Sequence, residues 1–560
     1  MALLTNGNRP AARMRMREAL VASIFLFFVS VPAAAVEPPI ELTIAAFNDL
    51  HGHLEAPRGE VGGVAAMAAR IDALRRERPH TVVVSAGDLI GASPLLSGLF
   101  RDEPTIEAMN RLGLDFAAVG NHEFDAGAAE LRRLQTGGCH ASGVRTCNGA
   151  QAGTSVPFEG ARFRFLAANV VDRRTGETLF PPYAVRRFDG VPVAFIGLTL
   201  RGTAGIVRAA GIAGLRFEDE ARTVNRLVRR LRAEGVEAIV VLLHEGGRHS
   251  GHPDECVDFD GPIVDIVARL DDAVDLVVSG HTHQAYHCRL PNAAGRAIPV
   301  TGAGSYGRYL TRIDLRLDAA SGDVRGVEVH NGAVRRDGPQ HPAVAQLVRD
   351  YAALAEPFAQ RVVGRIAADF TRDPDAAGQS TLGQLTADAQ LAVTRDAGAV
   401  AAFMNMGGLR ADLRARSSGE VTYEDLYAVH PFGNALVTLT LSGAQIKTML
   451  EQQFGCPRER SRPRPLQVSS GFEYRWNPAA APCARVVAES IRVQGAPLAP
   501  TQHYRITVND FLADGGDGLR VLREGTERTG GMLDRDALAS YLQQHGPVRP
   551  APTQRVRLVH

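Results

Sequence analysis

Five short apolar segments in the first half of the chain are each followed at once by side chains that commonly bind metal ions. Their length, their aliphatic composition and the glycines or polar residues that end them predict buried β-strands. The segments are Leu42–Phe47, Thr81–Ser85, Phe116–Val119, Ala238–Leu243 and Leu276–Ser279. Strands of an open α/β sheet usually carry functional groups at their carboxyl ends, so we expect the side chains that follow these segments to meet in one site.

Seven aspartate, asparagine and histidine residues in these polar blocks are candidate metal ligands. They are Asp49, His51, Asp88, Asn121, His244, His281 and His283. A single Asp-x-His or Gly-Asp pair is common by chance, and a lone histidine after a strand is more often structural than a ligand. Five blocks in succession instead predict a site for two divalent metal ions. One carboxylate would bridge the ions, and imidazole and amide groups would complete each coordination shell.

The order of these blocks (D-x-H, G-D, G-N-H-E, H, G-H-x-H) resembles that of the calcineurin-like metallophosphoesterases. The segments Asn48–Gly52 and Gly120–Asp125 more narrowly resemble the 5′-nucleotidase and UDP-sugar hydrolase family. This resemblance implies two ligand sets that share Asp88 as the bridge. The first set is Asp49, His51, Asp88 and His283, and the second is Asp88, Asn121, His244 and His281.

The identity of the metals stays open. His283 stands where other family members have Gln, and imidazole is an equally good ligand but leaves the metal preference undefined. Zn, Mn, Co and Mg are all compatible with this mixed set of nitrogen and oxygen ligands.

His122 and Asp125 are the predicted catalytic pair. His122 directly follows the ligand Asn121, so its side chain is expected to point elsewhere in the same cavity. The resemblance implies that His122 stabilises the transition state and the departing oxygen, while Asp125 hydrogen-bonds its ring. An alternative role for Asp125 is to cap a helix over Ala126–Leu134. The neighbours His53 and Glu123 receive no role.

Three further motifs in the C-terminal half resemble nucleotide-binding elements of the same family. They are Asn405–Arg410, His430–Asn434 and Asn509–Gly518. The resemblance implies that the rings of Phe432 and Phe511 stack on a base, each contact contributing roughly 1–3 kcal/mol. The predicted substrate-binding residues are Asn405, Gly408, Arg410, Phe432, Phe511 and Asp517.

Within this set, Asn405 is expected at the base edge, Asp517 at the ribose hydroxyls and Arg410 at the phosphate. The alternative for Phe432 and Phe511 is that they only anchor their loops. One position departs from the family, which usually has a further phosphate-binding arginine where this chain has Ala376. Arg372 is near enough in sequence to be a candidate replacement.

At 560 residues the chain is expected to form two or three domains. Between about residues 41 and 310, apolar strands alternate with helical stretches such as Val64–Arg76, Ile106–Leu112 and Glu220–Ala233, which predicts an α/β domain. The helical spacing of His341–Arg365 predicts a connecting helix, and a second domain of α+β type follows it.

The predicted boundaries are 36–340 for the first domain, 341–366 for the connecting helix and 367–560 for the second domain. The resemblance implies a calcineurin-like metallophosphoesterase sandwich for the first domain and a 5′-nucleotidase C-terminal fold for the second.

The N-terminus predicts export. Arg13, Arg15 and Arg17 precede the apolar run Ala19–Val31 and the small-residue site Ala33–Ala35, a pattern typical of a cleaved signal peptide over residues 1–35. An uncleaved membrane anchor is the less favoured alternative, because the apolar run is short. In a periplasmic or secreted protein the six cysteines are expected to form disulfides, and pairing by neighbourhood gives Cys139–Cys147, Cys256–Cys288 and Cys456–Cys483.

Charge argues against binding to nucleic acid or to a membrane surface. The formal net charge is +1, and the one basic segment, residues 457–465, lacks the aromatic residues of a nucleic-acid platform and is interpreted as a solvated loop. No membrane anchor is expected after signal cleavage. The oligomeric state is not predicted.

Together these features predict an exported, metal-dependent phosphoric ester hydrolase that removes the 5′-phosphate of nucleoside monophosphates. The alternatives are UDP-sugar hydrolysis and 2′,3′-cyclic nucleotide 2′-phosphodiesterase with 3′-nucleotidase activity. A non-catalytic nucleotide-binding protein is disfavoured because every ligand and His122 are present. A sulfur-compound hydrolase on the same scaffold would not need Phe432, Phe511 and Asp517.

Overall fold

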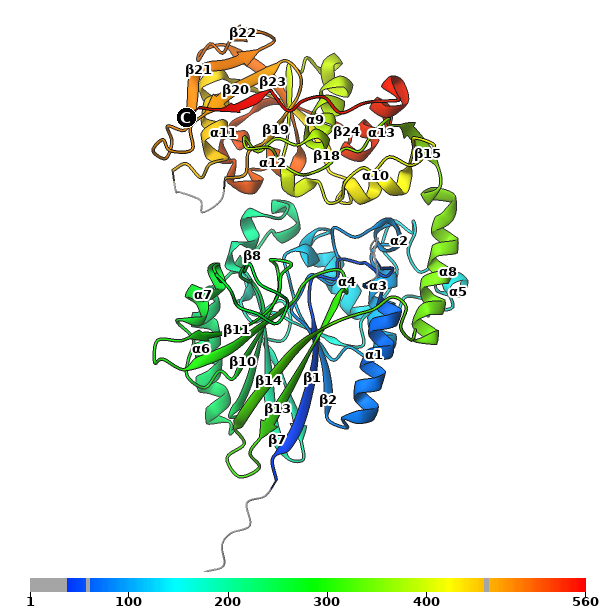
Figure 1. Ribbon diagram of the computed structural model, residues 1–560, viewed down its shortest axis with the longest axis vertical. Coiled ribbons are helices and arrows are strands. Elements are labelled where there is room, and N and C mark those ends of the chain that lie inside the picture. Colours follow the sequence, from blue (N-terminus) through cyan, green and yellow to red (C-terminus); the bar gives the residue numbers. More distant parts are fainter. Residues whose placement is uncertain (1–37, 57–60, 458–462, 560) are drawn as a thin grey trace, which may run out of the picture. The chain divides into compact units, whose positions relative to one another are not determined.

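The computed structural model describes residues 38–56, 61–457 and 463–559 (Figure 1). The predicted signal peptide, residues 1–35, lies outside the described residues, as does the middle of the basic segment, residues 458–462. Within the described ranges no helix is both long enough and apolar enough to cross a membrane.

Two six-stranded sheets packed face to face form the centre of the first domain. The first sheet has the order β14-β13-β1-β2-β3-β4 and the second β11-β12-β10-β9-β7-β6. In the first, the strands are β1 Ile40–Phe47, β2 Thr81–Ser85, β3 Phe116–Ala118, β4 Arg164–Leu166, β13 Tyr309–Leu317 and β14 Val324–Ala333. In the second, they are β6 Tyr183–Phe188, β7 Val191–Thr199, β9 Ala238–His244, β10 Leu276–Ser279, β11 Ala285–Pro291 and β12 Ala297–Ala303.

The five predicted strands are the central parallel strands of these sheets. β1 pairs with β2 and β2 with β3 in parallel, and β9 pairs with β10 in the same way. Side chains such as Ile44, Val82 and Val240 fill the space between the sheets. Both faces of these strands are buried, which explains why they are continuous apolar runs in the sequence instead of alternating patterns.

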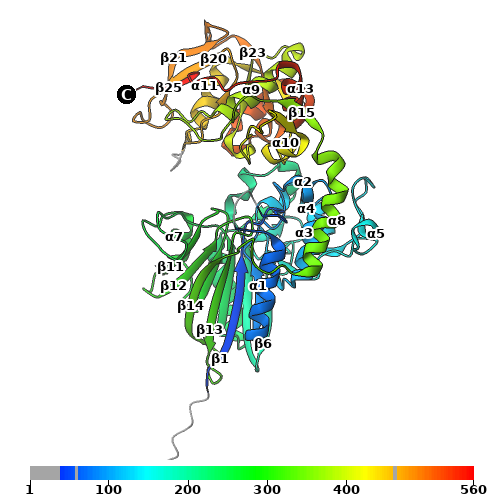
Figure 2. The same cartoon turned by 45° about the vertical axis from the view of Figure 1, so that its right-hand side comes forward.

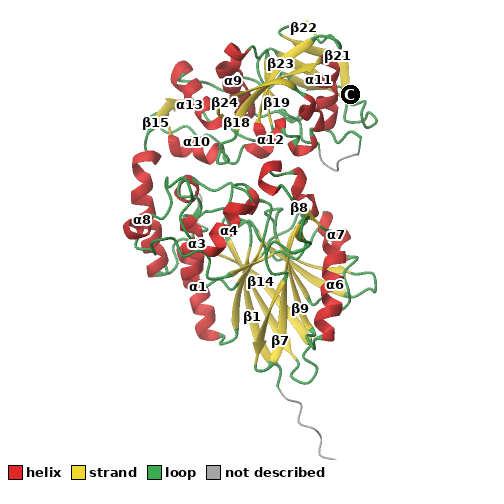
Figure 3. Cartoon of the chain, turned by 180° about the vertical axis from the view of Figure 1, so that it is seen from behind, coloured by secondary structure: helices red, strands yellow, loops and turns green. Residues whose placement is uncertain are grey.

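Helices cover the outer face of each sheet. On the first sheet lie α1 Val64–Glu77, α2 Leu95–Gly98, α3 Glu103–Leu112, α4 Ala128–Thr136 and α5 Gly149–Ala152, and on the second lie α6 Glu220–Ala233 and α7 Pro262–Val267. Figure 3 shows α1 and α3 on one side of the paired sheets and α6 and α7 on the other. The first domain is therefore the predicted α/β sandwich.

The predicted connecting helix is shorter than expected. α8 spans Pro342–Ala359, and the strand β15 Val362–Arg365 follows it. α8 lies beside α1 and α3 (Figure 2). Its residues Leu347, Tyr351 and Ala355 belong to the core of the first domain. The apolar spacing that extended the prediction to residue 365 includes Phe358 and Val362, which are 40% and 49% exposed, so the spacing there does not mark a buried helical face.

The C-terminal part has mixed topology, as predicted for an α+β domain. A five-stranded sheet has the order β19-β16-β23-β18-β24, and a four-stranded sheet has the order β22-β21-β20-β25. The strands are β16 Ala401–Met404, β18 Ala435–Ser442, β19 Gln467–Val468, β20 Phe472–Trp476, β21 Val486–Val493, β22 Ala496–Pro497, β23 His503–Asn509, β24 Thr526–Leu533 and β25 Val556–Leu558. The helices are α9 Thr381–Thr394, α10 Tyr423–Val429, α11 Gly443–Gln452, α12 Asp510–Ala513 and α13 Asp534–His545. The boundaries placed at residues 340 and 366 stay predictions.

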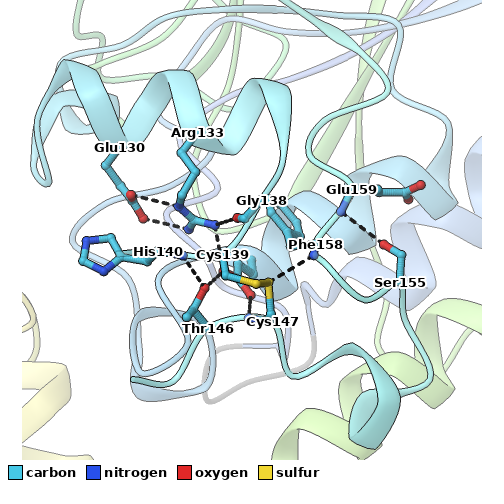
Figure 4. The surroundings of a disulfide bond; sticks show 11 residues. Glu130, Arg133, Gly138, Cys139, His140, Thr146, Cys147, Ser155, Phe158 and Glu159 are labelled. Carbon is cyan, nitrogen blue, oxygen red and sulfur yellow. Dashed lines mark hydrogen bonds and ion pairs between the residues drawn. A yellow bond between two sulfur atoms is a disulfide. The ribbon is translucent and has the colours of Figure 1, made fainter. Parts of the chain in front are cut away.

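All three predicted disulfides are present. They join Cys139 to Cys147, Cys256 to Cys288 and Cys456 to Cys483. The first closes the loop after α4, where Arg133 donates hydrogen bonds to Glu130 and to the carbonyl of Gly138 (Figure 4). These bonds tie the loop to the helix that precedes it.

Candidate active site

The seven candidate ligands lie where the sequence placed them, at the carboxyl ends of parallel strands. Asp49 and His51 follow β1, Asp88 follows β2, Asn121 follows β3, His244 ends β9, and His281 and His283 follow β10. The first five are almost fully buried, at 2% exposure or less. The candidate ligands therefore come from the strand ends of both sheets and lie at one edge of the sandwich.

The ligand atoms gather in two groups joined through Asp88. In one group, Nε2 of His283 lies 3.3 Å from Oδ1 of Asp49 and 3.1 Å from Nε2 of His51. In the other, Nε2 of His244 lies 3.0 Å from Oδ2 of Asp88, and His281 completes the cluster. Nε2 of His51 lies 3.6 Å from the same Asp88 oxygen, so this carboxylate is within reach of both groups.

Buried lone pairs without hydrogen-bond partners show that these residues fit metal ions. Oδ1 of Asn121 and Nε2 of His244 have no hydrogen-bond partner among the described residues. The Nδ1 atoms of His51 and His244 face the carbonyl oxygens of Gly91 and Ala86 at 2.9 and 2.7 Å. A carbonyl only accepts, so each Nδ1 carries the proton and each Nε2 presents a lone pair. Divalent ions would satisfy these otherwise costly buried atoms.

The backbone at five of the seven candidate ligands is left-handed. The φ angles are 50° at Asp49, 48° at His51, 52° at Asp88, 69° at His281 and 57° at His283. For a residue other than glycine this conformation costs on the order of 1–2 kcal/mol. Such strain at several adjoining positions is typical of a site whose side chains must be aimed at one point.

Asp125 contacts the ring of His122 and does not cap α4. Nδ1 of His122 lies 2.9 Å from Oδ2 of Asp125, which also accepts a hydrogen bond from the amide of Ala92. α4 begins after Gly127, and no side chain caps it, so the alternative role for Asp125 is wrong. Burial lowers the pKa of His122, but the carboxylates of Asp125 and Asp88 outweigh it and raise the pKa above its ordinary value.

Two residues that the sequence left without a role hold the ligand loops. The buried carboxylate of Glu123 accepts hydrogen bonds from the amides of Asp88, Leu89 and Gly120 at 2.9, 2.7 and 2.6 Å. It thereby joins the loop after β2 to the loop after β3. Asn48 donates to Oδ2 of Asp49 at 2.6 Å. Only their positions inside the motifs N-D-L-H and G-N-H-E mark them in the sequence, because hydrogen bonds to backbone amides leave no pattern.

The candidate nucleotide-binding residues lie in loops that share contacts, because Arg208 donates to Asn434 and pairs with Asp510. Asn405 donates to Oδ2 of Asp517 at 3.0 Å, beside the buried Gly408. The ring of Phe432 lies nearly parallel to that of His122 at a centroid distance of 5.6 Å, and the guanidinium of Arg410 lies 5.9 Å from the centroid of Phe432. Phe511 packs against the core of the C-terminal sheets, and no ring contact among the described residues joins it to Phe432.

Arg372 lies beside the loop that carries Arg410. Its Nη1 donates to the carbonyl of Leu409 at 3.2 Å, and its amide donates to Oδ1 of Asp412 at 2.9 Å. Its side chain is 43% exposed. The structure therefore places this guanidinium near the loop of Arg410, while its role as a replacement for the arginine missing at Ala376 stays a prediction.

Comparison with known proteins agrees with this arrangement. Residues 42–285 match the calcineurin-like phosphoesterase family and residues 362–524 match the 5′-nucleotidase C-terminal domain. The cell wall protein Lmo0130 of Listeria monocytogenes is 30% identical over 553 residues, which cover 92% of this chain and 68% of Lmo0130. The chain belongs to the 5′-nucleotidase family.

Two other proteins are similar to this chain over most of its length. The 5′-nucleotidase precursor of Thermus thermophilus has a TM-score of 0.76 and 28% identity, covering 93% of this chain and 99% of its own. The endonuclease YhcR of Bacillus subtilis is 31% identical over 496 residues, or 86% of this chain, which spans 37% of YhcR. The family places this chain among metal-dependent phosphoester hydrolases, and calcineurin-like phosphoesterases bind two divalent metals.

Proposed function

We propose that this protein is an exported 5′-nucleotidase that hydrolyses nucleoside monophosphates to nucleoside and phosphate. The observation that carries the proposal is the position of Phe432 and Arg410. An aromatic ring from the nucleotidase C-terminal element lies against His122, and the guanidinium of Arg410 lies over that ring. His122 itself lies among the candidate metal ligands. Phosphoester chemistry and nucleotide recognition can therefore act on one small molecule.

The ligand assignment follows the two observed groups. Asp49, His51 and His283 would hold one ion, His244, His281 and Asn121 the other, and Asp88 would bridge them. Two divalent ions bound there would neutralise phosphate oxygens and lower the pKa of a bound water.

His122 has the geometry of an acid at the leaving group. Nδ1 of His122 donates a hydrogen bond to Asp125, which leaves Nε2 directed away from the carboxylate. The two neighbouring carboxylates raise the pKa of His122 and favour its protonated form. A protonated ring can hydrogen-bond the departing 5′-oxygen and deliver a proton to it. Arg410 adds a fixed positive charge on the side of Phe432.

The nucleoside would be recognised by the remaining residues. Phe432 and Phe511 present rings for base stacking, and Asn405 and Asp517 present an amide and a carboxylate for the base edge and the ribose hydroxyls. UDP-sugar hydrolysis and the 2′,3′-cyclic phosphodiesterase reaction need the same elements. The 5′-monophosphate is favoured by the likeness to a 5′-nucleotidase precursor over nearly the whole chain.

A substrate panel tests the function. Phosphate release is measured with AMP, UMP, UDP-glucose, ATP, 3′-AMP and 2′,3′-cyclic AMP, after incubation of the purified protein with Zn, Mn, Co or Mg. We expect the largest kcat/KM for a nucleoside 5′-monophosphate. A kcat/KM at least about tenfold larger for UDP-glucose or for 2′,3′-cyclic AMP would replace the proposed substrate by that one.

Export is supported by the three disulfides, which persist in oxidising compartments. The N-terminal sequence of the protein from its native compartment tests it. A mature N-terminus near residue 36 is expected, whereas an intact N-terminus with six free thiols would rule out export.

A further inference from the structure

One arginine of the basic segment 457–465 lies beside the carboxylate proposed to bind ribose. Nη1 of Arg464 donates to Oδ1 of Asp517 at 3.2 Å, while Asn405 donates to Oδ2 at 3.0 Å. The three side chains line one cavity together with Gln453, Leu466 and Leu519. The sequence had suggested only a solvated loop here, and the contact with Asp517 changes that interpretation for Arg464.

The backbone of Arg464 is fixed from the inside of the domain. Its amide donates to the carbonyl of Gln453, and the side-chain oxygen of Gln453 accepts from the amide of Leu466 at 2.7 Å. Gln453 is 1% exposed and donates to the hydroxyl of Tyr474 at 2.9 Å. The disulfide Cys456–Cys483 anchors the other end of the segment. The backbone of Arg464 is therefore fixed, and its guanidinium lies at the cavity.

The guanidinium itself can change partner at little cost. The side chain of Arg464 is 59% exposed, and an ion pair this exposed adds little stability. A ligand that offers a stronger acceptor than a carboxylate already hydrogen-bonded to Asn405 can draw it away from Asp517. Phosphate is such an acceptor, because arginine binds its oxygens in a forked, charge-assisted geometry.

The charges of Asp517 and Arg464 together decide whether a ribose that carries a phosphate can bind at this cavity. A carboxylate alone accepts the ribose hydroxyls but repels a phosphate attached to either of them. A guanidinium 3.2 Å from Asp517 offsets that repulsion and adds donors for the phosphate.

We propose that Arg464 is a specificity-determining residue that binds a phosphate esterified to the 2′- or 3′-oxygen of the ribose. The protein would then accept nucleotides that carry this second phosphate as well as the 5′-phosphate that is hydrolysed. The second phosphate is terminal in a nucleoside 3′,5′-bisphosphate and internal in a 5′-phosphorylated dinucleotide. This inference rests on the proposed function, because it needs Asp517 at the ribose.

The test compares substrates within each variant. The kcat/KM for loss of the 5′-phosphate is measured chromatographically with AMP, adenosine 3′,5′-bisphosphate and the dinucleotide pApA. The variants are Arg464→Gln, Arg464→Lys and the control Arg475→Gln, which removes an exposed positive charge from β20, away from the cavity. We expect the ratio of bisphosphate to AMP to fall about tenfold in Arg464→Gln, as for one lost charge-assisted hydrogen bond. It should fall less in Arg464→Lys and stay constant in Arg475→Gln.

The dinucleotide separates the two sources of the second phosphate. If its ratio to AMP falls with that of the bisphosphate, an internal phosphodiester also binds Arg464; if only the bisphosphate responds, the ligand is a terminal phosphate. If Arg464→Gln still hydrolyses AMP and leaves the ratio to AMP unchanged for both substrates, the role of Arg464 is wrong but the proposed function stands. Wild-type protein that cleaves bis-p-nitrophenyl phosphate but not AMP would instead overturn the proposed function, and this inference with it.

Discussion

Asp88 is the residue on which both halves of the candidate metal site depend. Its Oδ2 lies 3.0 Å from Nε2 of His244 and 3.6 Å from Nε2 of His51, while its Oδ1 accepts the amide of His122 at 2.8 Å. Burial raises the pKa of Asp88, but the nearby imidazoles, with His244 first, outweigh it and hold the pKa well below its usual range. A single buried carboxylate thus supplies negative charge to two ligand groups.

Replacing Asp88 with Asn should remove that charge and release at least one ion. We expect purified Asp88→Asn to contain fewer than two metals per chain by elemental analysis and to lose most of its phosphatase activity, because metal chemistry supplies much of the transition-state stabilisation. Asp115→Asn is a control, because Asp115 directly precedes β3 and so lies at the end of that strand opposite Asn121. Two ions per chain with near-normal turnover in Asp88→Asn would show that the ligand assignment is wrong.

The sequence predicted which candidate ligand side chains lie close together, but not the hydrogen bonds and ring contacts that fix their positions. The seven candidate ligands could be predicted because each follows an apolar strand in a recognisable block. The hydrogen bonds that Glu123 accepts from three backbone amides could not be predicted from the sequence, because backbone amides are the same at every residue and mark no partner. The stacking of Phe432 on His122 joins residues far apart in the chain and leaves no local signal.

At the element scale, predictions were best where one face of a helix or both faces of a strand are buried. α6 has the predicted bounds because its apolar residues follow the helical period closely and Asp219 caps its first turn. The prediction for α8 extended too far, because the apolar residues Phe358 and Val362 continue the helical spacing although their side chains are exposed. α3 illustrates a feature that spacing does not reveal, a buried carboxyl group at Glu107, which is 3% exposed.

Glu107 should make stability depend on pH. Burial, followed by the negative charge of Glu159, raises its pKa from an ordinary value of 4.5 to about 7, and its Oε1 has no hydrogen-bond partner among the described residues. The folded state therefore binds this proton more tightly than the unfolded state. The stabilising effect of the proton is complete below about pH 4.5 and is lost as the pH rises to about 7, at a cost on the order of 1–3 kcal/mol.

Glu107→Gln should remove this dependence. We expect its thermal unfolding midpoint to exceed that of the wild type at about pH 8.5 and to differ less at about pH 5.5, measured by calorimetry. Glu77→Gln, at the exposed end of α1, should change neither midpoint. A gain at the lower pH as large as the gain at the higher pH would mean that Glu107 does not titrate in this range.

At the scale of the whole molecule, chemistry and nucleotide recognition are assigned to different parts of the chain. The α/β sandwich and the α+β fold could both be predicted from strand and helix patterns together with family motifs. The contact of Phe432 with His122 could not be predicted, because it depends on how the chain after α8 returns to the loops of the candidate ligands. The proposed function depends on that contact.

The most direct test compares a nucleotide with a small phosphoester. In Phe432→Ala/Phe511→Ala, two lost stacking contacts are worth roughly 2–6 kcal/mol in total, which should lower the kcat/KM for AMP by a factor of about 30 or more. Hydrolysis of bis-p-nitrophenyl phosphate should fall only slightly, while His122→Ala should lose kcat on both substrates. Phe511→Ala alone serves as a control for disturbance of His122, because Phe432 is the one of the two rings that contacts His122 among the described residues. Equal losses on both substrates in a well-folded double variant, and in Phe511→Ala, would contradict the division of labour and with it the assignment as a 5′-nucleotidase.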